Sequence, residues 1–242
     1  MERDELAAWL RLTLTPGVGN ATVRKLLAAF GLPQAVFAQS EQTLRQLVSA
    51  QQATALLDVP AGLEPLAERT WHWLEEANGN VQRRVATLGD AAYPVSLLHI
   101  EDPPLLLYLM GQLALPAPVP AAIAIVGSRN PTPQGESNAR QFAHAFAQAG
   151  LTVVSGLALG IDGAAHAGAL EGAEASGHQD GQWATIAVVG TGLDRVYPGK
   201  HRDLAHRIAR HGRSCRSWHS TTAASSSNLH DRLAPKQRIS WR

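Results

Sequence analysis

The chain has 242 residues, of which 45% are hydrophobic and 17% charged, and its formal net charge is +1. These values fit one large or two small globular domains, and they exclude an overall basic field as the basis of nucleic-acid binding. A single cysteine excludes a disulfide framework and a cysteine-based zinc site, and no apolar run reaches the roughly 18 residues of a membrane span. Because the start MERDELAAWL is acidic and does not resemble a signal peptide, we expect a cytoplasmic protein.

The first part of the chain carries helical patterns and predicts an all-helical domain over residues 1–78. Apolar residues recur there at the spacing of one helix face, interrupted by glycine and proline. The predicted helices span residues 3–14, 21–30, 40–57 and 63–77.

A glycine-rich turn joins the first two predicted helices. Its sequence, Pro16-Gly17-Val18-Gly19, resembles the hairpin of helix-hairpin-helix motifs, whose backbone N–H groups can face a phosphate. An ordinary corner between two helices explains the same residues equally well. Arg24 and Lys25 are the only cations nearby, so both interpretations stay open.

Residues 79–120 link the helical domain to the rest of the chain. The turn sequence Asn78-Gly79-Asn80 marks the domain boundary. Short strands are expected in VATL and in LLLYLMG, and Pro116, Pro118 and Pro120 form a stiff connector after them.

Three apolar segments of the next part predict buried strands: 121–127, 151–156 and 184–190. The first and the third stop at glycine, and the first two are apolar almost throughout, which favours a parallel sheet covered on both faces. Apolar residues at i, i+3, i+4 and i+7 from Ala139 predict a helix between the first two strands, closed by Gly150. The crossover of this strand–helix–strand unit should be right-handed. A further helix is expected over 202–210.

The carboxyl ends of these strands are where an open parallel sheet binds ligands. Glycine there lets a ligand approach the backbone, serine offers a hydroxyl, and the guanidinium of Arg129 suits phosphate. Lys200 and Arg202 could neutralise phosphates, and the ring of Tyr197 could stack on a base. The alternatives are that Arg129 pairs with a carboxylate of the protein, and that Asp194 and Asp203 cancel the charge of a solvated loop. The candidate ligand contacts are Gly127, Ser128, Arg129, Ser155, Gly156, Tyr197, Lys200 and Arg202.

Other polar residues suggest structural roles. Asp162 can cap the alanine-rich helix that follows the second strand, and His166 is expected to be a packed histidine rather than a proton carrier. His178 and Asp180 belong to a polar segment expected to be an exposed loop rather than a metal site. We expect no cofactor, no metal ion and no catalytic residue.

Three segments together resemble the DNA-processing protein A (DprA/Smf) family. They are IVGSRNPTPQG, VVSGLALGIDGAAHAGAL and IAVVGTGLDRVYPGKHRDL, and the IEDPPLLLYLMG stretch before them also matches. The resemblance covers about residues 1–210. It implies an α/β fold with a Rossmann-like parallel sheet, preceded by a small helical domain similar to sterile-alpha-motif and helix-hairpin-helix domains.

The resemblance also implies a function. The family binds single-stranded DNA in natural transformation, protects it and hands it to the RecA recombinase as a homodimer, without acting as an enzyme. By position, Arg129 matches a DNA-binding arginine of the family, and Lys200 matches approximately a DNA-contacting lysine.

After residue 210 the chain departs from the family pattern. Residues 211–242 are dense in Ser, Arg and His and show no strand-like alternation. We interpret this segment as a disordered or out-of-frame tail of a truncated family member, which leaves the sheet incomplete and removes the dimer and RecA surfaces. The sheet-forming domain then spans residues 79–210. A genuine basic tail that adds nucleic-acid affinity is the competing interpretation.

Two other functions are alternatives to DNA binding. A nucleotide-processing enzyme of the lysine-decarboxylase-like Rossmann group would carry a Pro-Gly-Gly…Gly-Thr…Glu motif, which is absent, and the Gly127 turn lacks the G-x-G-x-x-G spacing of dinucleotide enzymes. The remaining possibility is a frame-shifted fragment without function.

Overall fold

The computed structural model describes residues 1–76, 81–113, 121–177, 183–190, 192–193, 196–211, 213–217 and 238–241, with residue 211 and the last two ranges described by their backbone alone. The elements of these residues are α1 (Arg3–Leu14), α2 (Asn20–Phe30), α3 (Pro33–Phe37), α4 (Glu41–Leu44), α5 (Ala50–Leu57), α6 (Leu63–Glu75), β1 (Gln82–Thr87), the 3₁₀ turn η1 (Val95–His99), β2 (Leu106–Gly111), β3 (Ala122–Gly127), α7 (Pro133–Gln148), β4 (Thr152–Ser155), α8 (Ile161–Ala175), β5 (Thr185–Val189), the 3₁₀ turn η2 (Gly199–His201), α9 (Arg202–His211), β6 (Arg213–Ser217) and β7 (Arg238–Trp241). None of the helices among these residues is long and apolar enough to cross a membrane.

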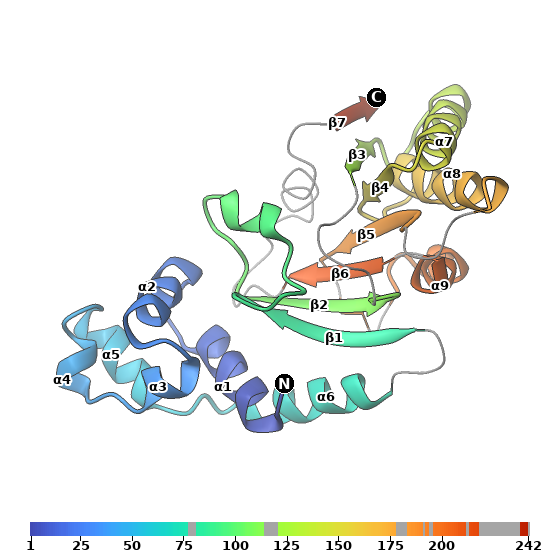
Figure 1. Cartoon of the computed structure of the whole chain (residues 1–242). Helices are drawn as coiled ribbons and strands as arrows, with labels where there is room; N and C mark the ends of the chain where they lie inside the picture. Colours follow the sequence, from blue (N-terminus) through green and yellow to red (C-terminus); the bar gives the residue numbers. More distant parts are fainter. Residues whose placement is uncertain are drawn as a thin grey trace.

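Helices α1–α6 form the helical part at the start of the chain (Figure 1). The pattern over residues 40–57 divides into two helices because it contains two serine caps. The hydroxyl of Ser40 accepts the backbone N–H of Thr43, and that of Ser49 accepts the N–H of Gln52. Each cap supplies a partner for a helix N–H that would otherwise lack one, so each serine starts a new helix.

The sheet has the strand order β1-β2-β6-β5-β4-β3-β7 (Figure 1). Strands β3, β4 and β5 lie side by side and parallel, as their apolar sequences predict. Strand β2 runs antiparallel to both β1 and β6, so the sheet is mixed rather than wholly parallel. Parallel strands joined through α7 and α8 confirm an α/β, Rossmann-like fold.

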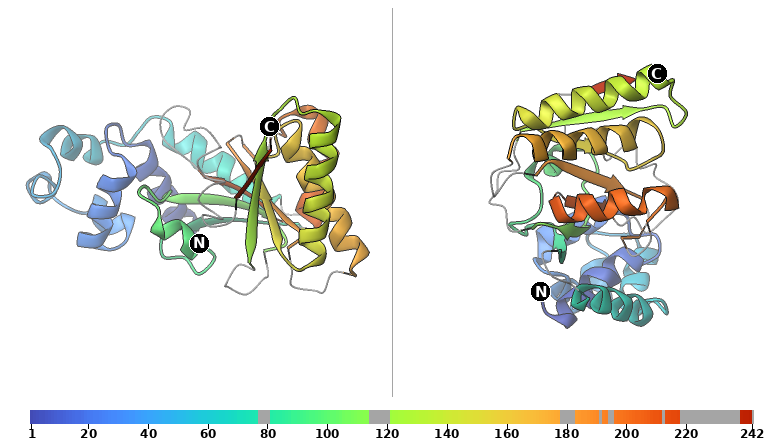
Figure 2. Two further views of the ribbon diagram at one scale, coloured as in Figure 1. Left: turned by 90° about the horizontal axis from the view of Figure 1, so that it is seen from above. Right: turned by 90° about the vertical axis from the view of Figure 1, so that its right-hand side faces the viewer.

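The helices α7, α8 and α9 cover one face of the sheet (Figure 2). Alternation along β5 divides its side chains between the faces: Ala187 and Val189 belong to the core beneath α8 and α9, whereas Ile186 and Val188 belong to the core that includes Leu97 of η1. In the described part of the chain, regular α-helices therefore cover only one face, where cover on both was expected.

Helices α1–α6 pack on the same face of the sheet as α9. Leu106 and Tyr108 of β2 belong to the core formed by α1–α6, whereas Leu107 and Leu109 point to the side of η1. Arg24 of α2 also donates a hydrogen bond of 2.8 Å to Asp102, in the loop before β2. The apolar core thus continues from the helices into the sheet.

The segment after residue 210 contains two strands, which corrects the expectation that it forms none. Strand β6 pairs with β2 on one side and β5 on the other, and β7 pairs with β3. The backbone N–H and C=O groups of β6 form hydrogen bonds with β2 on one side and β5 on the other. Such backbone hydrogen bonds depend little on side-chain alternation. The domain limits and the out-of-frame origin of the segment stay predictions.

Candidate functional site

The candidate site lies where β3, β4 and β5 end. Because these strands are adjacent and parallel, their last residues, Gly127, Ser155 and Val189, meet at one edge of the sheet. Helix α8 follows β4, the middle strand, so its first turn begins between the loops that follow the two outer strands. The loop after β3 is bonded to this turn, and the loop after β5 is bonded to the segment that leads into it.

The loop after β3 contacts the start of α8 directly. The backbone N–H of Ile161 donates to the carbonyl of Ser128 over 3.1 Å, and the Ser128 hydroxyl accepts the N–H of Asn130 over 3.0 Å. Gly160 has a φ of +78°, and a Cβ built there would lie 2.4 Å from the Ser128 carbonyl oxygen and 2.9 Å from the carbonyl carbon of Arg129. Only glycine therefore lets the Arg129 loop lie this close to α8.

The loop after β5 contacts the same helix turn from the other side. The Nδ1 atom of His201, in η2, lies 2.9 Å from the carbonyl oxygen of Leu157 and donates its proton to it. A Cβ at Gly163 would lie 2.6 Å from Cε1 of the same imidazole. Gly160, Gly163 and His201 were not among the sequence-predicted residues, although they position the ones that were.

This arrangement brings Arg129 and Lys200 to one edge of the sheet. Both side chains are exposed, and among the residues that the structure describes neither forms a hydrogen bond or an ion pair. Their strands are separated by β4 alone, so the strand ends lie two strand spacings, about 10 Å, apart. The alternative of a salt bridge between Arg129 and a carboxylate of the protein has no support within the described residues.

The other predicted contacts at this edge differ in accessibility. Gly127 is exposed, Gly156 and Ser128 are half-buried, and Tyr197 is 72% exposed, so its ring is open to a stacking partner. Asp203 is exposed and forms no ion pair with Lys200 in the described structure, and Asp194 lies outside the described residues.

Two assignments need correction. Ser155 is fully buried, and its hydroxyl donates to the carbonyl of Ile125 over 2.7 Å, so it holds β4 to β3 and does not face a ligand. Asp162 is not the cap of α8: the helix starts after Gly160, and Asp162 lies in the first turn, where its carboxylate accepts the N–H of Ala158. Arg202 is exposed at the start of α9 and lines a pocket on the side of α6.

His166 is a packed histidine, as expected. It is fully buried, and its Nδ1 lies 2.7 Å from the hydroxyl of Thr185. That hydroxyl donates its own proton to the carbonyl of Val153 over 2.6 Å, so it accepts from the imidazole. The imidazole thereby connects α8 to β5 and β4, below the surface of the candidate site.

The hairpin Pro16–Gly19 lacks uncommitted cations beside it. Arg24 is paired with Asp102, and the ammonium of Lys25 donates to the carbonyl of Leu47 over 2.7 Å. Val18 is buried, and the Gly17 carbonyl accepts from the side chain of Gln52. These contacts favour a structural corner over a phosphate site.

The structure offers no metal centre within the described residues, where no group of three His, Cys, Asp or Glu side chains could hold an ion. His178 and Asp180 lie outside the described part of the chain.

Comparison with known proteins places this geometry in a family. The family model described as "DNA recombination-mediator protein A" matches residues 84–232, more than half of the chain. The chain belongs to this family. The match includes β3–β5 and both loops of the candidate site, and it continues into the segment after residue 210.

Individual relatives agree. Protein Smf of Synechocystis is 32% identical over 217 residues, covering 88% of this chain and 50% of that protein. A putative DNA processing protein DprA of Mycobacterium tuberculosis is 43% identical over 109 residues, covering 45% of this chain and 26% of that protein. The chain thus spans at most about half the length of these relatives.

The crystal structure of DNA processing protein A from Streptococcus pneumoniae has the same fold. It aligns with a TM-score of 0.65 at 23% identity, covering all of this chain and 78% of that one.

Proposed function

We propose that the chain binds single-stranded DNA, without regard to sequence, at the edge formed by the ends of β3, β4 and β5. The observation that carries this proposal is the attachment of two loops to the start of α8 and the segment that leads into it: Ser128 bonds to Ile161, and His201 bonds to Leu157. These bonds bring the loops that carry Arg129 and Lys200 to the same edge, where both side chains are exposed and without partners in the described structure.

The chemistry of the edge suits a flexible polyanion. A guanidinium and an ammonium neutralise two phosphates, and an exposed tyrosine ring can stack on any base. The N-terminus of α8 adds little, because Asp162 already places a carboxylate in its first turn. Phosphate binding therefore depends on the side chains of Arg129 and Lys200, with Gly127, Ser128 and Gly156 letting the backbone of the strand approach.

Family membership supports the wider role. A DNA recombination-mediator protein acts on DNA that a recombinase will use, so we infer a place in natural transformation: protecting incoming strands and loading RecA. Since the chain spans about half of its relative in Synechocystis, RecA loading and dimer formation are parts of this proposal that need their own measurement.

The test is the salt dependence of binding to an oligothymidylate, measured by fluorescence anisotropy. Each phosphate contact contributes about 0.7 to the slope of log K against log salt for single strands. Arg129→Ala and Lys200→Ala should each lower the affinity and reduce the slope by about that amount. Arg69→Ala is the matched control, because it removes an exposed arginine of α6 that has no partner in the described structure. If both edge variants match the control, the assignment is wrong.

A further inference from the structure

A second candidate site is a pocket between α6 and α9. Its volume is about 970 Å³, and β1 and β2 contribute Arg83 and Met110 to its wall. No residue of the pocket belongs to the edge that holds Arg129, and Arg202 is the one sequence-predicted contact that lines it.

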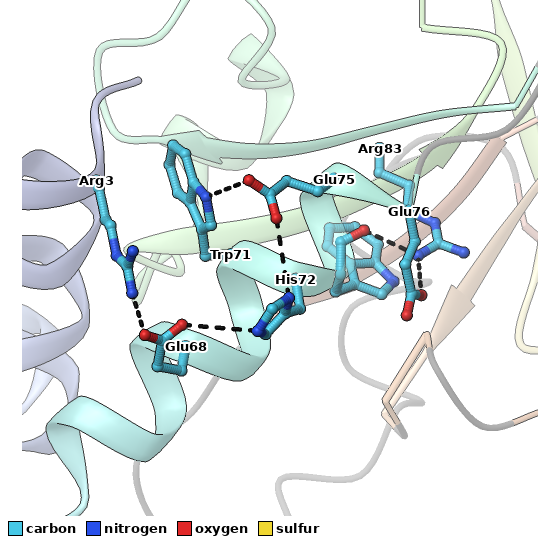
Figure 3. Close-up of polar contacts among 8 residues, drawn as sticks. Arg3, Glu68, Trp71, His72, Glu75, Glu76 and Arg83 are labelled. Carbon is cyan, nitrogen blue, oxygen red and sulfur yellow. Dashed lines mark hydrogen bonds and ion pairs between the residues drawn. The ribbon is translucent and has the colours of Figure 1, made fainter.

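Arg83 and Glu76 form one wall of the pocket and compensate each other's charge. The guanidinium of Arg83 donates to the carboxylate of Glu76 and to the backbone carbonyl of Trp73, both over 2.8 Å (Figure 3). These bonds join the end of α6 to β1. Arg83 is therefore committed to the protein and is not available to a ligand.

Helix α9 forms the opposite wall and supplies uncompensated donors. Arg202, His206 and Arg210 line the pocket at i, i+4 and i+8, and none of their side chains has an ion-pair partner among the described residues. Residues four apart lie on one face of a helix, and eight residues rise about 12 Å. Arg207, on the next face, is instead paired with Glu174 of α8 over 3.2 Å. Among the described residues, the arginines of α9 that face the pocket, Arg202 and Arg210, are thus the unpaired ones.

The rest of the lining is mostly apolar. Met110, Leu193 and Val196 contribute apolar side chains. The small side chains of Ala205 and Ala209 leave space on the surface of α9 between the two arginines. A ligand that uses both parts needs negative charge along one side and a flat apolar body on the other. Inorganic phosphate would use only the cations, whereas a nucleotide has phosphate and base in this arrangement.

We propose that this pocket binds a nucleotide unit, with its phosphate at Arg202 and Arg210 and its base on the apolar lining. The unit is either a free nucleotide or the continuation of a bound strand. The second source rests on the proposed function: η2 leads directly into α9, so Arg202 lies two residues after Lys200, and a strand leaving the edge can follow α9 into the pocket.

The test uses the full chain, thymidine monophosphate and a long oligothymidylate. His206→Glu places a carboxylate four residues from each arginine, where it pairs with both and removes their charge from the ligand. The double variant Arg202→Ala/Arg210→Ala removes the two cations directly. Arg207→Glu is the matched control on the same helix. All these side chains lie at the surface or half-buried, and thermal unfolding checks that each variant is folded.

We expect both pocket variants to lower the affinity for at least one ligand about tenfold or more, and the control to leave it unchanged. Loss confined to the oligonucleotide, with a salt slope reduced by about 0.7 in the double variant, identifies the strand as the source. Loss of monophosphate binding identifies a free nucleotide. Equal affinities of the pocket variants and the control for both ligands overturn the proposal. Failure of the proposed function would look different, because oligonucleotide binding would then not respond to Arg129→Ala or Lys200→Ala.

Discussion

Gly160→Ala tests whether the α8 turn positions Arg129 for binding. Gly160 lies 32 residues from Ser128 in sequence. It has neither a side chain nor a charge with which to bind a ligand itself. Its substitution therefore changes binding only by moving the loop after β3. A Cβ at this position would lie 2.4 Å from the carbonyl oxygen of Ser128 and 2.7 Å from Cδ of Pro131.

Two effects set the size of the perturbation. The backbone of Gly160, at φ +78° and ψ −127°, is strained for any residue with a Cβ, at a cost of about 1–3 kcal/mol. The loop must also move away by at least about 0.6 Å, because real Cβ contacts essentially never fall below 3.0 Å. Since the obstacle is backbone and a proline ring, no flexible side chain can absorb the shift. We expect a folded protein, less stable by about 1–3 kcal/mol, with the Arg129 loop displaced.

A double-mutant cycle measures the consequence for binding. A hydrogen bond between a guanidinium and phosphate contributes about 1.5–3 kcal/mol, so losing it lowers affinity roughly 10- to 150-fold. If Gly160→Ala acts through Arg129, it should have little further effect in the Arg129→Ala background. Gly62→Ala is the control, because Gly62 has an ordinary φ and open space around it. Full affinity of a folded Gly160→Ala variant, or effects that simply add, would refute the positioning role.

Three further predictions concern stability, measured by urea unfolding. Gly168→Ala should lower the free energy of unfolding by about 1–2 kcal/mol, because its Cβ would lie 2.1 Å from the Arg140 carbonyl and overpacking outweighs the gain in helix propensity; an unchanged or higher value would contradict the close packing of α7 and α8. The hydrogen bond from Arg140 lowers the pKa of Glu171, so this contribution is present above about pH 4.5 and is lost as pH falls through the lowered pKa. Because both side chains are partly exposed, Glu171→Gln should cost only about 0.3–1 kcal/mol at pH 7 and progressively less as the pH falls through the lowered pKa, and a cost that does not change with pH would exclude the ion pair as its cause. Ser49→Ala should cost about 1 kcal/mol, because it removes the hydroxyl that accepts the backbone N–H of Gln52 at the start of α5, and an unchanged free energy of unfolding would contradict this capping role.

The strands and helices of the sheet-forming part could be predicted from the sequence because their signals are local. A continuous apolar run that stops at glycine identifies a buried strand, and this holds for β3 and β5. The parallel order of β3, β4 and β5 then follows from the crossover helices. The convergence of Arg129 and Lys200 on one edge needed no information beyond that.

The orientation of Ser155 could not be predicted in the same way. Strand alternation places it on the face of Val153, toward the core beneath α7 and α8. Because β4 is buried on both faces, its sequence gives no contrast between an inward and an outward position. The serine was therefore assigned to the ligand, whereas its hydroxyl bonds to Ile125.

The contacts that hold the site together join residues far apart in sequence. Gly160 reads as one more glycine in GLALGIDG, and its need to lack a Cβ arises only when the loop after β3 lies against it. In the sequence, His201 likewise looks like an ordinary polar residue beside Lys200. Its imidazole nevertheless bonds to the backbone carbonyl of Leu157, 44 residues earlier. Strand β6 is a similar case, since the polar sequence RSCRS becomes a strand because β2 and β5 leave a place for its backbone.

Helix α8 explains why the loops of Arg129 and Lys200 come together at one edge of the sheet. Its buried side is mostly alanine and glycine, and Gly168 and Gly172 let the backbone of α7 approach within contact distance. His166 fixes the same helix to β5 through Thr185. A helix held on both sides cannot rotate or slide, so its first turn is a rigid support. The loop of Arg129 is bonded to this first turn, and the loop of Lys200 is bonded to Leu157, in the segment that leads into it. Substitutions that loosen α8 should therefore reduce the contributions of both cations together, whereas substitutions in one loop should affect only its own cation.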